Sequence, residues 1–263
     1  MGKEGKFTME NCKEYKVPGR NLKVFICEDY DSMSRKAGEL VGAVLAAKPE
    51  AVMGLATGSS PVGLYRELIR MNREGKLDFA KIRSYNLDEY YPIQPDNEQS
   101  YHYFMAQNLF NHINIDKANV HVPDGRAGDV EEACRAYEAA LNELGGVDVQ
   151  VLGIGHNGHI GFNEPADVFP PVTHVVDLQE STIHANARFF EREEDVPRHA
   201  VTMGIGTIMR AKKIVLVANG TGKAEVLRAA LTGPIDPRVP ASILQVHPDV
   251  TFVLEKEAAS LLP

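Results

Sequence analysis

The fold of this chain is decided by residues 153–165, which read GIGHNGHIGFNEP. This stretch follows residues 147–152, a short apolar run rich in β-branched side chains, which is typical of a buried strand. Glycines allow unusual backbone angles and let other groups approach the main chain closely. A strand therefore delivers two histidines, two asparagines and a glutamate into a glycine-lined loop. In an open α/β sheet ligands bind at this place, although a purely structural glycine turn is the alternative.

Short apolar runs alternate along the chain with segments whose apolar residues recur at helical spacing. We expect strands over residues 22–27, 51–56, 82–87, 147–152, 174–178, 213–218 and 250–254. We expect helices over residues 33–45, 64–69, 101–111, 130–144, 183–190 and 223–231. This alternation predicts a Rossmann-like α/β fold, with a mostly parallel sheet and helices on both faces. Residues 21–263 should form a single domain, preceded by a loose extension over residues 1–20.

The composition narrows the range of partners. The chain has 263 residues, 28 of them basic and 36 acidic, and the net charge of −8 gives no overall basic surface for nucleic acid. No apolar run approaches the ~20 residues that span a bilayer, so no membrane partner is expected. The polar N-terminus lacks the apolar core of a signal peptide. The oligomeric state stays open, and a homo-oligomer is compatible with the sequence.

The cysteines indicate a reducing environment. Cys12, Cys27 and Cys134 are odd in number, scattered, and form no CxxC pair. This pattern argues against a disulfide framework and against a cysteine zinc site. Cys134 lies on the apolar stripe of an expected helix, so we assign it to the core. The cytoplasm is the expected location.

Residues 57–61, TGSSP, join an expected strand to an expected helix. Ser60 suits the N-cap of that helix, and Pro61 suits its first position. The start of a helix offers N–H groups and a partial positive charge, so this turn is a candidate seat for an anion, most often phosphate. It lacks the GK[ST] ending of a Walker A loop, and a plain capped turn is the alternative.

Residues 219–223, NGTGK, repeat this arrangement. They place Lys223 at the start of a helix, where its charge opposes the helix dipole. Such a conflict is expected where function overrides local preference, and a phosphate between Lys223 and the Thr57 turn would resolve it. Arg188 would complete the clamp, although an arginine on an amphipathic stretch is more often only part of a solvated face.

Asp88 and Glu89 follow an expected strand, at the same sheet edge as the central loop. A carboxylate that is partly buried there would have a raised pKa, which suits a general base. The alternative is an ordinary turn, since acidic residues often begin turns.

Taken together, these segments resemble the glucosamine-6-phosphate deaminases. The matching segments keep the family's order and approximate spacing: residues 56–61, 86–90, 100–105, 153–165, 187–190 and 222–224. The most specific of them is the run GHIGFNEP, and the resemblance extends from about Leu22 to near the C-terminus. It implies conversion of glucosamine 6-phosphate and water into fructose 6-phosphate and ammonia, a step of amino-sugar catabolism. No cofactor and no metal is implied, and the partner is a small sugar phosphate.

The resemblance also implies a role for each candidate residue. Asp88 moves a proton between C2 and C1 during the aldose–ketose isomerisation. His159, supported by Glu164 and Asn157, opens the sugar ring. The residues that hold the phosphate are Thr57, Gly58, Ser59, Arg188 and Lys223. These roles agree with the chemistry, which needs an acid/base near the ring oxygen, a base near C2 and a charged clamp at the far end.

Other functions compete with this interpretation. A 6-phosphogluconolactonase shares the fold and the Gly-x-Gly-x-x-Gly-His pattern, but Glu164-Pro165 and residues 87–90 favour the deaminase. Another sugar-phosphate isomerase of the same fold is a further alternative. A non-catalytic sugar-phosphate sensor would need a DNA-binding segment, and the polar N-terminus is too short for a helix-turn-helix.

Overall fold

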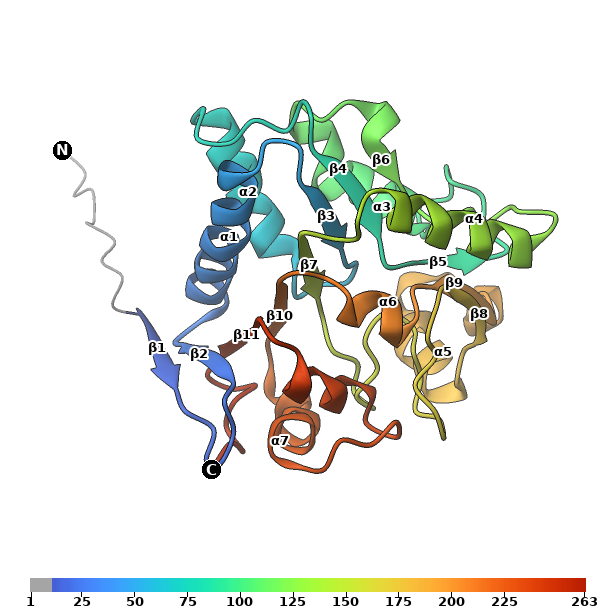
Figure 1. Ribbon diagram of the computed structural model, residues 1–263. Helices are drawn as coiled ribbons and strands as arrows, with labels where there is room; N and C mark the ends of the chain where they lie inside the picture. The colour runs from blue at the N-terminus through green and yellow to red at the C-terminus, as the bar shows by residue number, and fades with distance from the viewer. Residues whose placement is uncertain (1–10) are drawn as a thin grey trace.

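The computed structural model describes residues 11–263 and contains one large sheet (Figure 1). Its eight strands lie in the order β1-β2-β11-β10-β7-β3-β4-β6, and every neighbouring pair except β1 and β2 is parallel. The strands are Cys12–Tyr15 (β1), Lys23–Cys27 (β2), Val52–Leu55 (β3), Arg83–Asn86 (β4), Val120–His121 (β6), Val149–Leu152 (β7), Ile214–Ala218 (β10) and Val250–Glu255 (β11). The prediction of a mostly parallel α/β sheet is confirmed.

Both faces of this sheet are covered. Every residue of β3, β7 and β10 is buried, and side chains alternate between the two faces along a strand, so neither face meets solvent there. The α-helices are Tyr30–Ala47 (α1), Val62–Arg73 (α2), Tyr101–Asn108 (α3), Val130–Glu143 (α4), Glu180–Asn186 (α5), Ile205–Met209 (α6) and Ala224–Thr232 (α7). Within residues 11–263, no helix combines the length and the apolar character needed to cross a membrane.

Local signals set where two of the helices begin. Asp129 precedes α4, and its carboxylate accepts a hydrogen bond from Glu132 N at 3.0 Å. The assignment for α2 is shifted by one residue. Pro61, not Ser60, occupies the N-cap position, and no side chain caps this helix. The Ser60 hydroxyl instead donates a hydrogen bond to Asn219.

A second, smaller sheet is not predicted by the sequence. Its three strands are antiparallel, in the order β5-β9-β8, and span Asp88–Tyr91 (β5), His199–Thr202 (β9) and His174–Asp177 (β8). Because β5 begins with two acidic residues, which are depleted in strands, the pattern favours a turn instead. This sheet contacts the central loop, since Phe162 N donates to Thr202 Oγ1 at 3.0 Å. The small sheet therefore carries Asp88 to that loop.

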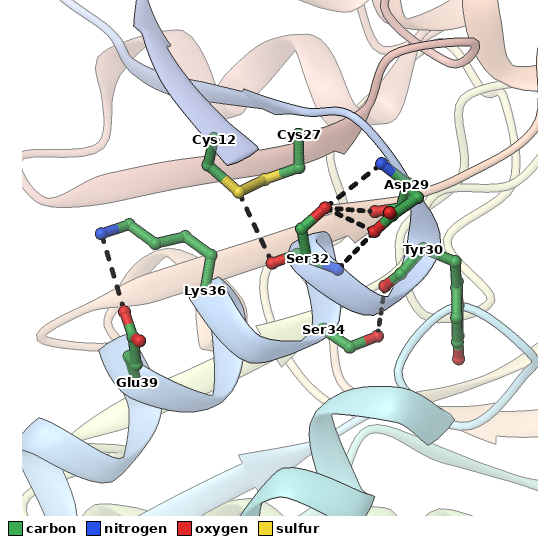
Figure 2. Close-up of a disulfide and its surroundings, with 8 residues drawn as sticks. All are labelled: Cys12, Cys27, Asp29, Tyr30, Ser32, Ser34, Lys36 and Glu39. Carbon is green, nitrogen blue, oxygen red and sulfur yellow. Dashed lines mark hydrogen bonds and ion pairs between the residues drawn. A yellow bond between two sulfur atoms is a disulfide. The ribbon is translucent and has the colours of Figure 1, made fainter. Parts of the chain in front are cut away.

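A disulfide joins Cys12 on β1 to Cys27 on β2, as Figure 2 shows. The two residues are direct partners in the antiparallel register, and their Cα atoms are 4.0 Å apart. The expectation that the cysteines form no disulfide is therefore wrong for this pair. The pairing of β1 with β2, which the sequence pattern does not reveal, brings the two cysteines opposite each other. Cys134 is free and buried, as its place on the apolar stripe predicts.

The N-terminal segment expected to be loose is only partly described. Residues 1–10 lie outside the described residues, whereas Cys12–Tyr15 forms the edge strand β1. After β1, Val17 is buried in the main core, with 2% of its surface exposed. The Tyr15 hydroxyl also donates to the main-chain oxygen of Pro263, so the described start of the chain contacts its end.

Asp148 ties three segments together at the start of β7. Its carboxylate binds the ammonium groups of Lys48 and Lys212, each at 2.7 Å, and accepts from Val52 N at 2.8 Å. Burial alone would raise the pKa of Asp148, but the two lysines and the N–H group together lower it. Because the pKa of this carboxyl is lower in the folded than in the unfolded protein, its ionised form stabilises the fold at pH values above the unfolded pKa. This contribution is lost as the pH falls through the folded pKa.

We expect Asp148→Asn to reduce the free energy of unfolding at pH 7 by about 1.5–3 kcal/mol, because a buried acceptor of two ammonium groups loses its charge. The matched control is Asp249→Asn. Asp249 binds Lys213 at 2.7 Å, but its side chain is 44% exposed, and such a pair contributes less than about 1 kcal/mol. Urea unfolding of both variants provides the measurement. Equal losses in the two variants would contradict the role given to Asp148.

Candidate active site

Four neighbouring strands of the large sheet end at one edge and release the polar segments of interest (Figure 1). In spatial order they are β10, β7, β3 and β4, and the segments that follow them are residues 219–223, 153–165, 57–61 and 88–91. From β3 the chain proceeds outward to β4 and β6, while from β7 it proceeds the other way, to β10 and β11. Open α/β sheets bind ligands where the strand order reverses, so the crevice beyond β3 and β7 is the candidate active site.

The central loop requires glycine at position 155 because the His159 ring packs against it. Gly155 N donates to His159 O at 2.9 Å, so the loop folds back on itself. A Cβ added to Gly155 would lie only 2.3–2.4 Å from three atoms of the His159 ring. Gly158 and Gly161 have φ angles of +90° and +60°, which other residues rarely adopt. The backbone of the loop thus fixes the position of the imidazole.

Glu164 connects His159 to helix α5. Glu164 Oε2 lies 3.4 Å from His159 Nδ1 and accepts from Asn157 Nδ2 at 2.6 Å, while Thr182 Oγ1 on α5 donates to Glu164 Oε1 at 2.5 Å. Burial alone would raise the pKa of Glu164, but His159, Thr182 and Asn157 together lower it. Glu164 therefore stays ionised and orients the imidazole, which is the arrangement of an acid/base histidine.

Asp88 approaches the same loop from the small sheet. It is 5% exposed, and its Oδ2 lies 3.6 Å from the position that a Cβ would take on Gly161. Burial, and then the charge of Glu89, raises the pKa of Asp88 well above its ordinary value. Its Oδ1 has no hydrogen-bond partner among residues 11–263. A buried carboxyl with a raised pKa next to a histidine loop is a candidate for proton transfer.

Glu89, the neighbouring acid, is occupied by backbone N–H groups of β5 and α3. Its carboxylate accepts hydrogen bonds from the N–H groups of Tyr90 at 2.9 Å, Tyr101 at 2.8 Å and His102 at 2.9 Å. Burial raises the pKa of Glu89 to about 7, although these three bonds act in the opposite direction. Because Glu89 holds the start of a helix, Asp88 is the acid that remains for chemistry.

The two glycine turns beside the central loop are joined to each other. Ser60 Oγ donates to Asn219 Oδ1 at 2.6 Å, which links residues 57–61 to residues 219–223. Gly220, with a φ of +82°, donates from its N–H to Glu255 Oε2 at 2.7 Å. Gly58 and Ser59 are exposed and Thr57 is half-buried, so their polar groups remain accessible. The hydroxyl and N–H groups of residues 57–59 therefore lie beside the second turn, and such groups at the start of a helix suit an anion.

Positive charge gathers at these two turns. Burial, and then the charge of Arg188, lowers the pKa of Lys223 to about 8. The charge of Lys223, then burial and Arg188, lowers the pKa of His156. His156 Nε2 also lies 3.6 Å from the position of a Cβ on Gly222. These mutual effects mean that Lys223, Arg188 and His156 lie close together, and a bound anion would relieve their repulsion.

The structure thus brings all the candidate residues to one sheet edge. All of them follow the four central strands except Arg188, which lies in the 3-10 helix Ala187–Phe189 directly after α5. The structure adds His156 and Thr182 to the candidate site, and the sequence pattern assigns no role to either residue. His156 lies within the glycine loop and could have been noticed there. Thr182 is a common residue type on a distant helix, so only its contact with Glu164 identifies it.

The geometry can hold an anion at one end and move protons at the other. The anion surface comes from the joined turns and the cluster around Lys223, whereas Asp88 and the His159–Glu164 pair supply two separate proton-transfer groups. Among the described residues, no group of three or more histidine, cysteine, aspartate or glutamate side chains is placed to hold a metal ion.

We expect Gly155→Ala to lower the free energy of unfolding by about 1–3 kcal/mol, because the new methyl group overlaps the His159 ring. Gly153→Ala, two residues earlier in the same loop, is the matched control, since a Cβ there meets no atom of the described residues within 4 Å. Urea unfolding of the two variants measures the difference. If both variants were as stable as the wild type, the His159 ring would not occupy the position described.

Comparison with known proteins identifies a common family. The family described as Glucosamine-6-phosphate isomerases/6-phosphogluconolactonase matches residues 29–253. A glucosamine-6-phosphate deaminase from Thermoanaerobacter pseudethanolicus is 54% identical over 242 residues, which are 92% of this chain and 96% of that protein.

Solved structures agree with this result. A monomeric glucosamine-6-phosphate deaminase superposes with a TM-score of 0.88 at 46% identity, over 90% of this chain and 99% of that one. A 6-phosphogluconolactonase from Trypanosoma brucei has a TM-score of 0.72 at 20% identity, over 93% and 100% of the two chains, and shows a shared fold alone. The chain belongs to the glucosamine-6-phosphate isomerase/6-phosphogluconolactonase family.

Proposed function

We propose that this protein is a glucosamine-6-phosphate deaminase, which converts glucosamine 6-phosphate and water into fructose 6-phosphate and ammonia in amino-sugar catabolism. The observation that carries the proposal is Asp88, a buried carboxyl with a raised pKa beside the His159 loop. An isomerisation needs a base that moves a carbon-bound proton. Hydrolysis of a lactone moves no such proton and therefore would not need Asp88. The relatives at 54% and 46% identity support the deaminase, while the lactonase at 20% supports only the fold.

Substrate binding begins at the phosphate group. The residues proposed to hold it are Thr57, Gly58, Ser59, Arg188 and Lys223. A phosphate dianion placed among them replaces the repulsion between Lys223 and Arg188 with attraction, so the pKa of Lys223 rises on binding. The fixed phosphate then orients the other end of the sugar toward Asp88 and His159.

Ring opening is the task proposed for His159. The imidazole, oriented by Glu164 and Asn157, takes the proton from the C1 hydroxyl and delivers a proton to the ring oxygen. The C1–O5 bond breaks, and C1 becomes an aldehyde. Glu164 stabilises the imidazolium that forms between the two transfers, because its charge lies 3.4 Å from Nδ1.

Isomerisation is the task proposed for Asp88. Its carboxylate takes the proton from C2 and returns it to C1, while the substrate's ammonium group gives one proton to the aldehyde oxygen. C1 becomes a CH2OH group, and an iminium group is left at C2. Water adds to this carbon, and the C2–N bond breaks to release ammonia and the ketone of fructose 6-phosphate. Burial raises the pKa of Asp88 in the empty site, whereas the ammonium group of the arriving substrate lowers this pKa and so favours the carboxylate. The substrate thus helps to generate its own base.

Three further expectations belong to this proposal. We infer one domain over residues 21–263, supported by one large core cluster that extends from Val17 to Ala259, with a smaller cluster around Tyr90 and Phe162 beside it. All the residues proposed for the site come from one chain, so a homo-oligomer would carry one site in every copy. We infer a cytoplasmic location from the sugar-phosphate substrate. Disulfides are rare in the cytoplasm. The Cys12–Cys27 disulfide lies at the far edge of the sheet, away from the proposed site.

We expect Lys223→Ala to raise KM for glucosamine 6-phosphate by roughly 10- to 100-fold with the fold intact, because one charge-assisted phosphate contact is lost. Lys223→Arg is the control, since it keeps the positive charge at every pH. The wild-type KM should rise above pH 8, as Lys223 with its pKa of about 8 loses its proton. The arginine variant should not share that rise. An unchanged KM in Lys223→Ala would remove Lys223 from the phosphate site.

We expect Asp88→Asn to fold and bind the phosphorylated sugar but to lose turnover by roughly 10²–10⁴-fold, the usual contribution of a general base. Asparagine has nearly the shape of aspartate but cannot accept the proton from C2. The variant should also stop exchanging the C1 proton of fructose 6-phosphate with deuterated water, which NMR detects directly. Exchange at the wild-type rate would show that Asp88 is not the base, and Glu89→Gln would then be the next variant to test.

A further inference from the structure

A groove lies between α2 and α3, outside the proposed active site. Its volume is about 510 Å³, within the range of small-molecule sites. Arg66, Arg70 and Arg73 line it from α2, and Gln107, Asn108 and His112 line it from the end of α3 and the 3-10 helix that follows. Positive side chains thus collect in a concave surface of a protein whose net charge is −8.

Two of these arginines lack acidic partners in the part of the chain that the structure describes. Arg70 is neutralised, because it binds Glu67 at 2.9 Å and Glu74 at 2.8 Å. Glu74, which also lines the groove, is used by Arg70 and by a neighbouring lysine. Within residues 11–263, neither Arg66 nor Arg73 forms an ion pair or a hydrogen bond through its side chain, and both are exposed. The groove therefore keeps two uncompensated guanidinium groups.

The spacing of these two arginines places both on the groove side of α2. They are seven residues apart, which is about two helical turns and about 10 Å along the axis. Basic residues in the last turn of a helix interact favourably with its dipole, which gives Arg73 a purely structural alternative role. That explanation does not extend to Arg66, which lies in the N-terminal half of α2. An anion between the two arginines accounts for both.

The facing wall supplies polar groups rather than charges. His112 Nε2 lies 2.8 Å from the backbone oxygen of Gln107, so the donor on this nitrogen is already used. Asn108 Nδ2 donates to Phe104 O at 2.8 Å. The Gln107 side chain is exposed, and its amide is available to a ligand's oxygen atoms. The groove thus combines two guanidinium groups with a neutral polar wall, a combination that suits a small organic phosphate.

We propose that the groove between α2 and α3 is a second anion site of this protein and binds a small phosphate ester through Arg66 and Arg73. The site differs from the proposed catalytic clamp, whose cations are Lys223 and Arg188. The two helices that form the groove are nevertheless connected to the proposed active site. Helix α2 starts directly after the Thr57 turn, and Glu89 holds the start of α3.

The test is calorimetric titration of the full chain with inorganic phosphate at constant ionic strength. Four proteins are compared: the wild type, Arg66→Gln/Arg73→Gln, Lys223→Ala, and the variant that combines all three changes. We expect two phosphate sites in the wild type. Arg66→Gln/Arg73→Gln should keep only the clamp site, Lys223→Ala should keep only the groove site, and the combined variant should keep neither. Loss of a groove contact should weaken binding there by about tenfold or more.

The controls separate the possible outcomes. Arg135→Gln removes an exposed arginine of α4 that is paired with Glu132, and should leave both sites unchanged. The urea midpoint of each variant should match that of the wild type, which shows that the fold is intact. If Lys223→Ala binds no phosphate, or if the combined variant binds it as tightly as Lys223→Ala does, the groove site is refuted. If Lys223→Ala keeps both sites, the proposed clamp is wrong while the groove stands.

Discussion

The parallel pairing of β3 with β7 is the constraint on which the rest of the structure depends. The two strands meet at Met53–Val149 and Gly54–Gln150, and from them the chain proceeds outward in opposite directions. A Cβ on Gly54 would lie 2.1 Å from the end of the buried Gln150 side chain, so glycine on β3 leaves room for that side chain. Because both strands end at the same edge, the Thr57 turn and the His159 loop become neighbours. Every function proposed for this edge follows from that proximity.

Local chemistry at this edge breaks several ordinary rules. Two adjacent acids are buried, a lysine stands at the start of a helix, and its pKa is lowered by burial and by an arginine. Each feature is unfavourable in the empty protein. A substrate with a phosphate at one end and an ammonium group near the other would relieve the repulsion among the cations and among the acids. The site thus uses unfavourable charges that its ligand can compensate, which is expected where function overrides local preference.

Most of the large sheet could be predicted from the sequence, because buried parallel strands appear as short apolar runs of the kind that ends at Leu152. The small sheet could not, since Asp88 and Glu89 begin its strand and mark a turn by composition. The Cys12–Cys27 disulfide depends on the pairing of an edge strand with little apolar pattern. Within the site, the glycine loop and its histidine were identifiable from their spacing. Thr182 was not, because it reaches Glu164 from a different helix and has no motif of its own.

The proposed chemistry separates this protein from lactonases that share its fold. The essential difference is a carbon-bound proton that Asp88 must move, which a lactonase does not need. The most direct measurement is a coupled assay of the wild-type protein that follows ammonia and fructose 6-phosphate together, with glucosamine 6-phosphate or 6-phosphogluconolactone as the substrate. We predict equal amounts of ammonia and fructose 6-phosphate from the first substrate and no hydrolysis of the second above the uncatalysed rate. Rapid hydrolysis of the lactone without release of ammonia from the amino sugar would contradict the account.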